Sequence, residues 1–292
     1  MSKAKPLPSS AGRWHVWIVA LGGFVLLLSW GAVTLVDLLG LVRLEQQLTA
    51  VGRQPVLWAT VLGEGGPVEN TQWALLGAGA AGSAYLAGIL RGRGQEGANR
   101  FWAIMSAALV LMLLEDAGNI RHHLGSYVNL LTGAEDGTHP AAVATERTVL
   151  LLIALVPVYA LLYHRTLPWR SAPTRRLLIG GYVAYGTVAT TNATRDFFGW
   201  YERAGDWVLT RVFAGRLGEI SQSAQDRGLT TGHEFMDTVF EESLELVGAT
   251  MLCAAVVAYA SHIRTDPSLA DGDPPVKTLS QQWRSRGPAD QR

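Results

Sequence analysis

Long runs of apolar residues alternate with short polar segments along most of the chain. The first run covers 16–36 without a charged residue, and at about 1.5 Å per residue it is long enough to cross a bilayer. The predicted spans are about 16–37, 73–90, 101–123, 148–164, 177–198 and 236–261. This pattern predicts an all-α, polytopic transmembrane helix bundle with about six spans.

The two ends of the chain are expected to lie outside the bundle. The first apolar run follows three basic residues, as in a signal peptide, but it exceeds the ~7–15 residues of a signal core, so we interpret it as a retained span. Residues 1–15 are predicted to be a cytoplasmic N-terminus and 16–262 the six-span domain. Residues 263–292 are rich in Pro, Asp, Ser and Gln and are predicted to be a disordered cytoplasmic tail.

Basic residues indicate how the bundle sits in the membrane. With six spans, the Lys and Arg residues before the first span, at 91–100, at 165–176 and after the last span all fall on one side. Cytoplasmic segments carry an excess of Lys and Arg, so both termini should be cytoplasmic. We expect a multi-pass protein of the cell membrane, or of the inner membrane in a bacterium.

Two regions between or within the spans have distinctive patterns. The second span contains Gly77, Gly79, Gly82, Ser83 and Gly88; small residues allow close helix approach, so this span is predicted to be central, with a lipid-facing helix as the alternative. Residues 205–220 are amphipathic and predict either a helix on the outer membrane surface, placed as a lid, or an ordinary connecting helix.

The composition argues against a soluble domain, a nucleic-acid partner and a cysteine-based site. Hydrophobic residues make up 49% and charged residues 16% of the chain, against about a quarter charged in soluble domains. Lys+Arg and Asp+Glu both number 24, so we expect the lipid bilayer and not nucleic acid as partner. The single cysteine, Cys253, excludes a disulfide framework or thiolate metal cluster. Composition gives no information on partner subunits.

Two polar stretches, 113–124 and 233–246, interrupt the apolar pattern. Residues 101–114 are uncharged and cover about 21 Å as a helix, so Glu115 and Asp116 should lie inside a ~30 Å hydrocarbon layer. The same reasoning from the other end of the last span places Glu245 about 24 Å deep. Carboxylates at such depth are costly and normally face the bundle interior with a partner.

A continuous third span would place Asp116, Asn119 and His123 on one face and Glu115 and His122 on the next. In the last span, Glu241 and Glu242 would lie one turn above Glu245. Carboxylates and imidazoles at this spacing on facing helices are typical of metal sites in helix bundles. We predict a divalent metal site, for Zn, Mn or Fe, in the outer leaflet between spans three, five and six.

The predicted ligands are Asp116, His123, Glu242 and Glu245, with Glu115, His122 and Glu241 as alternates. Asn119, Arg195, Asp196 and Asp237 are predicted to support these ligands or to orient a substrate. In this interpretation the chain is a metal-binding protein, and one form of it is a membrane metalloenzyme acting on a lipid-soluble or outer-face substrate.

Two other interpretations stay open. The acidic cluster could serve a proton- or cation-conducting channel or transporter, although inverted repeats would place matching clusters in opposite leaflets. Alternatively, Arg121 and Arg195 could pair with Glu115, Asp116 and Glu245 in a structural or assembly protein held by buried salt bridges.

Overall fold

The computed structural model describes residues 14–39, 41, 47, 50–51, 56–133, 139–164, 168–195, 197–213 and 230–265. These residues are helical and include no strand, which confirms the all-α prediction. The elements are α1 (Trp14–Val33), η2 (Thr34–Leu38), α3 (Leu57–Val61), α4 (Pro67–Gly92), α5 (Glu96–Gly118), α6 (Ile120–Thr132), α7 (Pro140–Tyr163), η3 (Pro168–Arg170), α8 (Ala172–Thr194), α9 (Trp200–Arg211), α11 (Thr231–Glu234), η4 (Phe235–Glu241) and α12 (Glu242–Thr265).

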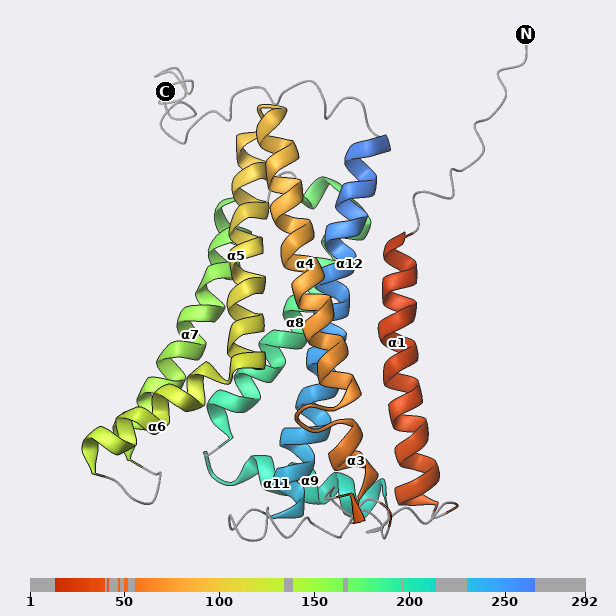
Figure 1. The fold of residues 1–292 in the computed structure, drawn as a ribbon, viewed down its shortest axis with the longest axis vertical. Coiled ribbons are helices and arrows are strands. Elements are labelled where there is room, and N and C mark those ends of the chain that lie inside the picture. Colours follow the sequence, from red (N-terminus) through yellow and green to blue (C-terminus); the bar gives the residue numbers. More distant parts are fainter. Residues whose placement is uncertain are drawn as a thin grey trace, which may run out of the picture.

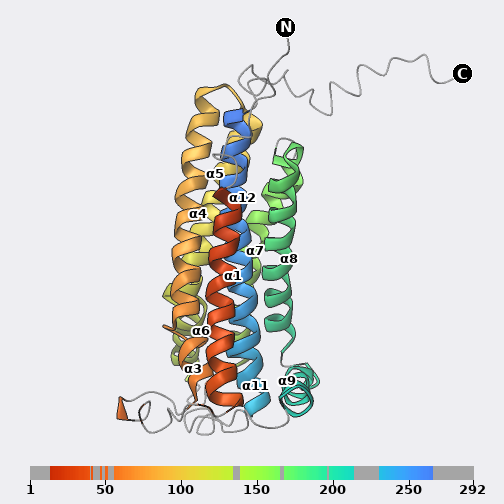
Figure 2. The same ribbon diagram turned by 90° about the vertical axis from the view of Figure 1, so that its right-hand side faces the viewer.

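The long helices form a bundle around α12 (Figure 1). Helix α12 packs against α1, α4 and α8, while α4 packs against α5 and α5 against α7. In the most apolar stretch of each helix, 67% of the residues are buried in the last span but only 11% in α7. The first residue of α1 and the last residue of α12 lie toward the same end of the bundle, as Figure 2 also shows.

Five helices are long and apolar enough to cross a membrane: α1 with η2, α4, α5, α7, and the continuous segment from α11 to α12. Their exposed side chains include Leu27 on α1 and Leu151 on α7, which suits lipid contact better than water. Helix α8 corresponds to the fifth predicted span, 177–198; it has the length, but its threonines and Arg175–Arg176 make it less apolar. The span count of about six therefore stays a prediction.

Close approach of α4 and α12 depends on two glycines of α4, which have no side chain at the contact. A Cβ on Gly82 would lie 2.8 Å from Cγ1 of Val256, and one on Gly79 would lie 3.6 Å from the backbone of Cys253. Helix α4 thus packs between α5 and α12, in agreement with the central position that its small residues predict.

The third predicted span, 101–123, is wrong at its outer end. Helix α5 ends at Gly118, and Asn119 has a left-handed backbone with φ of 47°, a conformation that Asn tolerates better than most residues. Helix α6 then leaves the bundle and packs against α7 (Figure 1). Residues on the two sides of Asn119 therefore do not share one helical face.

The end of the bundle away from the chain termini carries the shorter elements. Helix α9 lies across this end, as Figures 1 and 2 together show, and it contacts α11 and η4. A Cβ on Gly205 would lie 2.0 Å from the carbonyl oxygen of Gly232, so α9 and α11 touch backbone to backbone. Residues 205–213 belong to the predicted surface helix; 214–220 lie outside the described residues.

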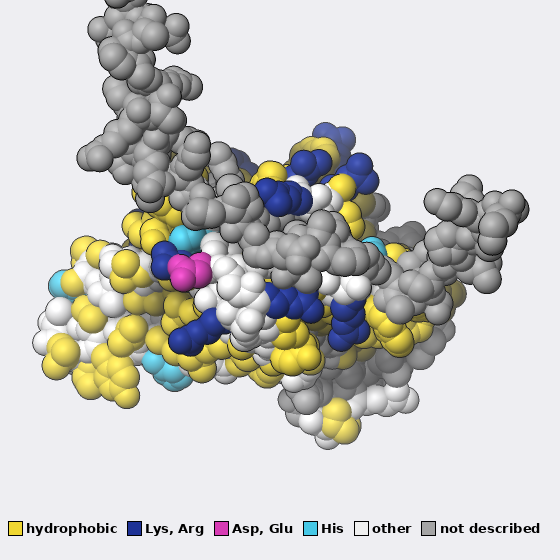
Figure 3. Space-filling model, turned by 90° about the horizontal axis from the view of Figure 1, so that it is seen from above, with side chains coloured by type: hydrophobic (Ala, Val, Ile, Leu, Met, Phe, Trp, Pro, Cys, Tyr) yellow, Lys and Arg dark blue, Asp and Glu magenta, His cyan; other side chains and the backbone are white. Residues whose placement is uncertain are grey.

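The opposite end of the bundle is rich in arginine (Figure 3). The exposed basic residues in its described part are Arg91, Arg93, Arg100, Arg170, Arg175, Arg176 and Arg264. Glu96, itself exposed, pairs with Arg100 at 3.3 Å. This is the end that the positive-inside rule assigns to the cytoplasm.

Candidate functional site

A buried glutamine joins the two acidic helices. Gln72 on α4 is completely buried, and its Nε2 donates to Asp116 Oδ2 at 2.5 Å and to Glu245 Oε2 at 2.8 Å. An amide nitrogen carries two N–H groups, so both bonds can form together. Gln72 therefore holds a carboxylate of α5 and a carboxylate of α12 at one point inside the bundle.

Other polar groups surround this point. Trp73 Nε1 donates to the same oxygen of Asp116 at 2.9 Å. Glu242 lies close enough to interact with the charges of Asp116, Glu245 and Glu69. Glu69 also interacts with the charge of Asp116 and accepts a hydrogen bond from the backbone N–H of Gly65. We refer to Glu69, Asp116, Glu242 and Glu245 as the acidic cluster.

Several atoms in and around the acidic cluster have no hydrogen-bond partner. They are Glu242 Oε2, Gln72 Oε1 and the hydroxyl oxygen of Tyr185 on α8, and the Tyr185 side chain interacts with the charges of Glu245, Asp116 and Glu242. Buried polar atoms without partners are uncommon and cost free energy. The cluster thus has unused capacity to bind a small polar ligand.

A second set of polar contacts lies beside the acidic cluster, toward the α9 end. Arg121 Nε lies 3.2 Å from Glu115 Oε1, and Arg121 Nη1 donates to Asn192 Oδ1 at 3.1 Å. Asn192 Nδ2 donates in turn to Glu241 Oε2 at 3.2 Å. With Tyr201, whose hydroxyl donates to Glu241 Oε1 at 2.7 Å, these residues form what we call the arginine network.

The arginine network connects α5, α6, α8, α9 and η4, and its carboxylate Glu241 has several hydrogen-bond donors. Glu241 accepts from Tyr201, from Asn192 and, at 3.4 Å, from Thr191 Oγ1. Burial and the negative charge of Glu241 raise the pKa of Tyr201 far above its usual value. Tyr201 therefore stays protonated and remains a donor to Glu241.

Further polar contacts continue this layer outward. His122 Nδ1 lies 3.4 Å from Glu146 Oε1 on α7, and Arg195 Nη1 lies 3.2 Å from Asp237 Oδ1. The predicted pairing of Arg121 with Glu115 is therefore present. Arg195 pairs with Asp237, and not with Glu115, Asp116 or Glu245 as the salt-bridge interpretation expected.

The structure brings together only part of the predicted metal site. Asp116, Glu242 and Glu245 meet in the acidic cluster, whereas His123 is exposed on α6 because the chain turns at Asn119. Among the alternates, Glu115 pairs with Arg121, His122 with Glu146, and Glu241 belongs to the arginine network. Within the described residues, no group of three or more His, Cys, Asp or Glu residues is arranged to hold a metal ion.

Of the residues expected to support the site, Asn119 forms the break between α5 and α6, and Asp196 lies outside the described residues. The sequence-based prediction missed Gln72, Trp73, Tyr185, Asn192 and Tyr201. Gln72 and Trp73 stand at the predicted start of the second span, where polar residues are ordinary. Their role becomes visible only because α4 begins earlier, at Pro67.

The helix that carries Glu241, Glu242 and Glu245 is irregular at this point. Residues Phe235–Glu241 form the π-helix η4, and the regular helix α12 begins at Glu242. π-helical turns widen the helix, change which side chains share a face, and are frequent at functional sites. Here the wider turn aims Glu241 at α8 and α9, while Glu245 points at α4.

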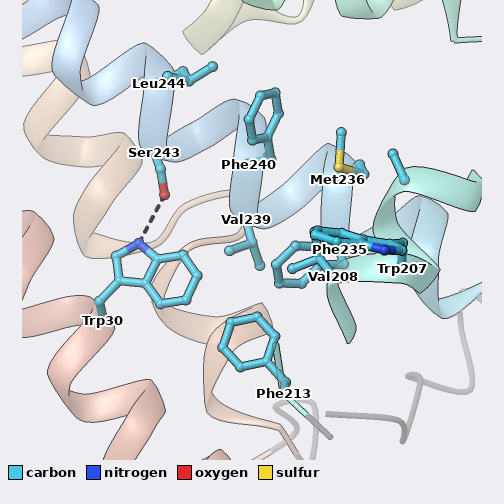
Figure 4. A pocket seen from close by; sticks show the side chains of 11 residues that line it. Trp30, Trp207, Val208, Phe213, Phe235, Met236, Val239, Phe240, Ser243 and Leu244 are labelled. Atoms are coloured by element: carbon cyan, nitrogen blue, oxygen red, sulfur yellow. Dashed lines mark hydrogen bonds between the residues drawn. The ribbon is translucent and has the colours of Figure 1, made fainter. Parts of the chain in front are cut away.

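An apolar pocket lies beside η4 (Figure 4). Its volume is about 650 Å³, and its lining residues come from α1, α9, the segment after α9, η4 and α12: Trp30, Ala204, Trp207, Val208, Phe213, Phe235, Met236, Val239, Phe240, Ser243 and Leu244. Trp30 Nε1 donates to Ser243 Oγ at 3.2 Å. None of the lining residues is ionisable, so the pocket is chemically separate from the acidic cluster.

Comparison with known proteins adds no further constraint: no protein-family model, curated protein or solved structure matches this chain.

Proposed function

We propose that this chain is an integral membrane protein that binds and passes protons at the acidic cluster. The observation that carries the proposal is the pair of hydrogen bonds from Gln72 to Asp116 and Glu245. Gln72 supplies two donors but no positive charge. Two carboxylates that share one neutral donor in a poorly polarisable interior repel each other when both are ionised, and one shared proton removes that repulsion.

The surroundings of the cluster support a proton as the ligand. The charged and titratable groups that face Asp116 and Glu245 are Glu69 from α4, Glu115 from α5, Tyr185 from α8, and Glu241 and Glu242 from η4 and α12. Apart from Tyr185 these are carboxylates, and the positive charge of Arg121 is paired with Glu115. Chains of Asp and Glu residues within membrane spans are typical of proton relays.

The test is infrared difference spectroscopy of the protein in lipid nanodiscs during changes of pH, combined with proton flux into liposomes. We expect the wild type to show a pH-dependent C=O band of protonated carboxyl groups that weakens in Asp116→Asn and Glu245→Gln. Flux should fall in the same variants. Glu96→Gln, which changes an exposed carboxylate at the arginine-rich end, is the matched control. A band and a flux that both variants leave unchanged would exclude the proposal.

A divalent cation is a second candidate ligand, favoured by the unpartnered Glu242 Oε2 beside Asp116 and Glu245. Carboxylate oxygens suit Mn or a similarly hard ion better than a soft one. Elemental analysis of the purified protein decides between the candidates. One metal ion per chain that is lost in Glu245→Gln would favour the cation over the proton.

A further inference from the structure

Arg121 holds a defined position between the acidic cluster and the outer polar layer. Its side chain is 14% exposed and that of Glu115 is 18% exposed. Besides Glu115, its guanidinium contacts Asn192 Oδ1 at 3.1 Å and His122 Nε2 at 3.3 Å. Contacts from α5, α6 and α8 therefore orient one positive charge, and a guanidinium keeps that charge at any physiological pH.

The partners of Arg121 also determine which carboxylates are available to a ligand. Glu115 and Asp116 are neighbours on α5, yet Glu115 pairs with Arg121 while Asp116 turns to Gln72 and Trp73. Glu115 still interacts with the charges of Asp116 and Glu245. Without Arg121, Glu115 would be a further uncompensated carboxylate beside the acidic cluster.

We propose that Arg121 sets the specificity of the acidic cluster for protons over metal cations, an inference that rests on the proposed proton-binding function. A metal ion needs several free carboxylates and is repelled by a nearby positive charge, and both effects grow in an interior of low dielectric constant. A proton needs one carboxylate oxygen and can share it with a hydrogen-bond donor. By neutralising Glu115 and placing a positive charge nearby, Arg121 leaves a site suited to the proton.

Asn192 contacts both Arg121 and Glu241 through different atoms of its amide group. Its carbonyl oxygen accepts from Arg121, and its amide nitrogen donates to Glu241, which Tyr201 and Thr191 also hold. The amide thus separates the cation from the second carboxylate of the arginine network. These hydrogen bonds to Glu241 all come from neutral donors. Among the described ion pairs, Arg121 therefore pairs with Glu115 and not with Glu241.

The experiment measures Mn²⁺ binding to the detergent-purified protein by electron paramagnetic resonance of the free ion. We expect no stoichiometric binding by the wild type, and an affinity at least about tenfold higher in Arg121→Gln. Arg121→Lys keeps the charge and should resemble the wild type. The double variant Arg121→Gln with Glu115→Gln should lose the added affinity, because the carboxylate released by the first change is then absent.

Arg195→Gln is the matched control, since Arg195 lies at the same end of the bundle but pairs with Asp237. An equal gain of Mn²⁺ affinity in Arg195→Gln would attribute the effect to general electrostatics and overturn the proposal. Tight binding by the wild type, or no gain in a folded Arg121→Gln protein, would also overturn it. If Arg121→Gln does not fold, Arg121→Met removes the charge while it keeps much of the side-chain volume, and the same gain is expected.

Failure of this proposal is distinguishable from failure of the proton-binding function. A wild type that shows the infrared band and flux of the acidic cluster, together with an Arg121→Gln variant that gains no Mn²⁺, leaves proton binding intact and removes only the role of Arg121. A wild type without a pH-dependent carboxyl band removes the proton-binding function itself.

Discussion

Neighbouring carboxylates in this protein have different partners, and the difference determines what each can do. Glu115 faces the Arg121 guanidinium, whereas Asp116 and Glu245 face the neutral amide of Gln72. Glu241 is surrounded by neutral donors, with Tyr201 the nearest at 2.7 Å. The positive charge of Arg121 therefore compensates Glu115, whereas the Gln72 amide brings no positive charge to Asp116 and Glu245.

Replacing Tyr201 with Phe should destabilise the folded protein by about 1–3 kcal/mol, because Glu241 would lose its shortest hydrogen bond inside the bundle. The measurement is the free energy of unfolding from denaturing-detergent titration. Because the pKa of Tyr201 is raised, wild-type stability should fall as the pH rises above the usual tyrosine value of about 10, and this loss should be smaller in the variant.

The control for this prediction is Tyr127→Phe on α6, where the side chain is exposed. That change should alter the free energy of unfolding by less than about 0.5 kcal/mol. Equal effects of the two substitutions would mean that the contact between Tyr201 and Glu241 adds nothing to stability.

At the scale of the elements, two irregularities place the polar residues. The left-handed Asn119 separates α5 from α6 and turns His122 and His123 away from Asp116. The π-helix η4 precedes the regular α12 and sends Glu241 and Glu245 to different neighbours. Both features lie next to the candidate site, and each changes the direction of a side chain that a regular helix would have aimed elsewhere.

The break at Asn119 can be tested with a pair of substitutions. Asn119→Gly should be tolerated, because glycine adopts positive φ without a steric penalty, whereas Asn119→Val should cost about 1–2 kcal/mol or more. Thermal unfolding of the two variants in one detergent measures the difference. Equal stability of the Gly and Val variants would show that a left-handed residue is not needed between α5 and α6.

These irregularities mark the limit of what the sequence predicts. Apolar runs and their lengths were sufficient to predict an all-α bundle with apolar membrane-crossing helices, and depth together with helical spacing grouped Asp116, Glu242 and Glu245. Hydrophobic periodicity assumes a regular helix, so it could not reveal the turn at Asn119 or the wide turn at η4. Gln72 was missed for a related reason, since a polar residue at a span boundary is uninformative until its helix is seen to extend beyond it.

The whole molecule has two chemically different ends. The end near the start of α1 and the end of α12 exposes arginines (Figure 3), whereas the other end carries α9 and the arginine network. The acidic cluster lies on α4, α5 and α12, next to the arginine network. If the arginine-rich end faces the cytoplasm, the proposed proton-binding function predicts that protons enter from outside through the layer that contains Arg121 and Glu241.

Cysteine labelling tests this orientation and the crossing of α8 together. The native Cys253 is buried, while Arg170 before α8 and Arg211 at the end of α9 are exposed. In intact cells, Arg211→Cys should react with a membrane-impermeant maleimide, and Arg170→Cys should react only after permeabilisation. Reaction of both positions from the outside would mean that α8 does not cross the membrane, and a reversed pattern would place the arginine-rich end outside. The reversed pattern would contradict proton entry from the external face, because the arginine network would then face the cytoplasm.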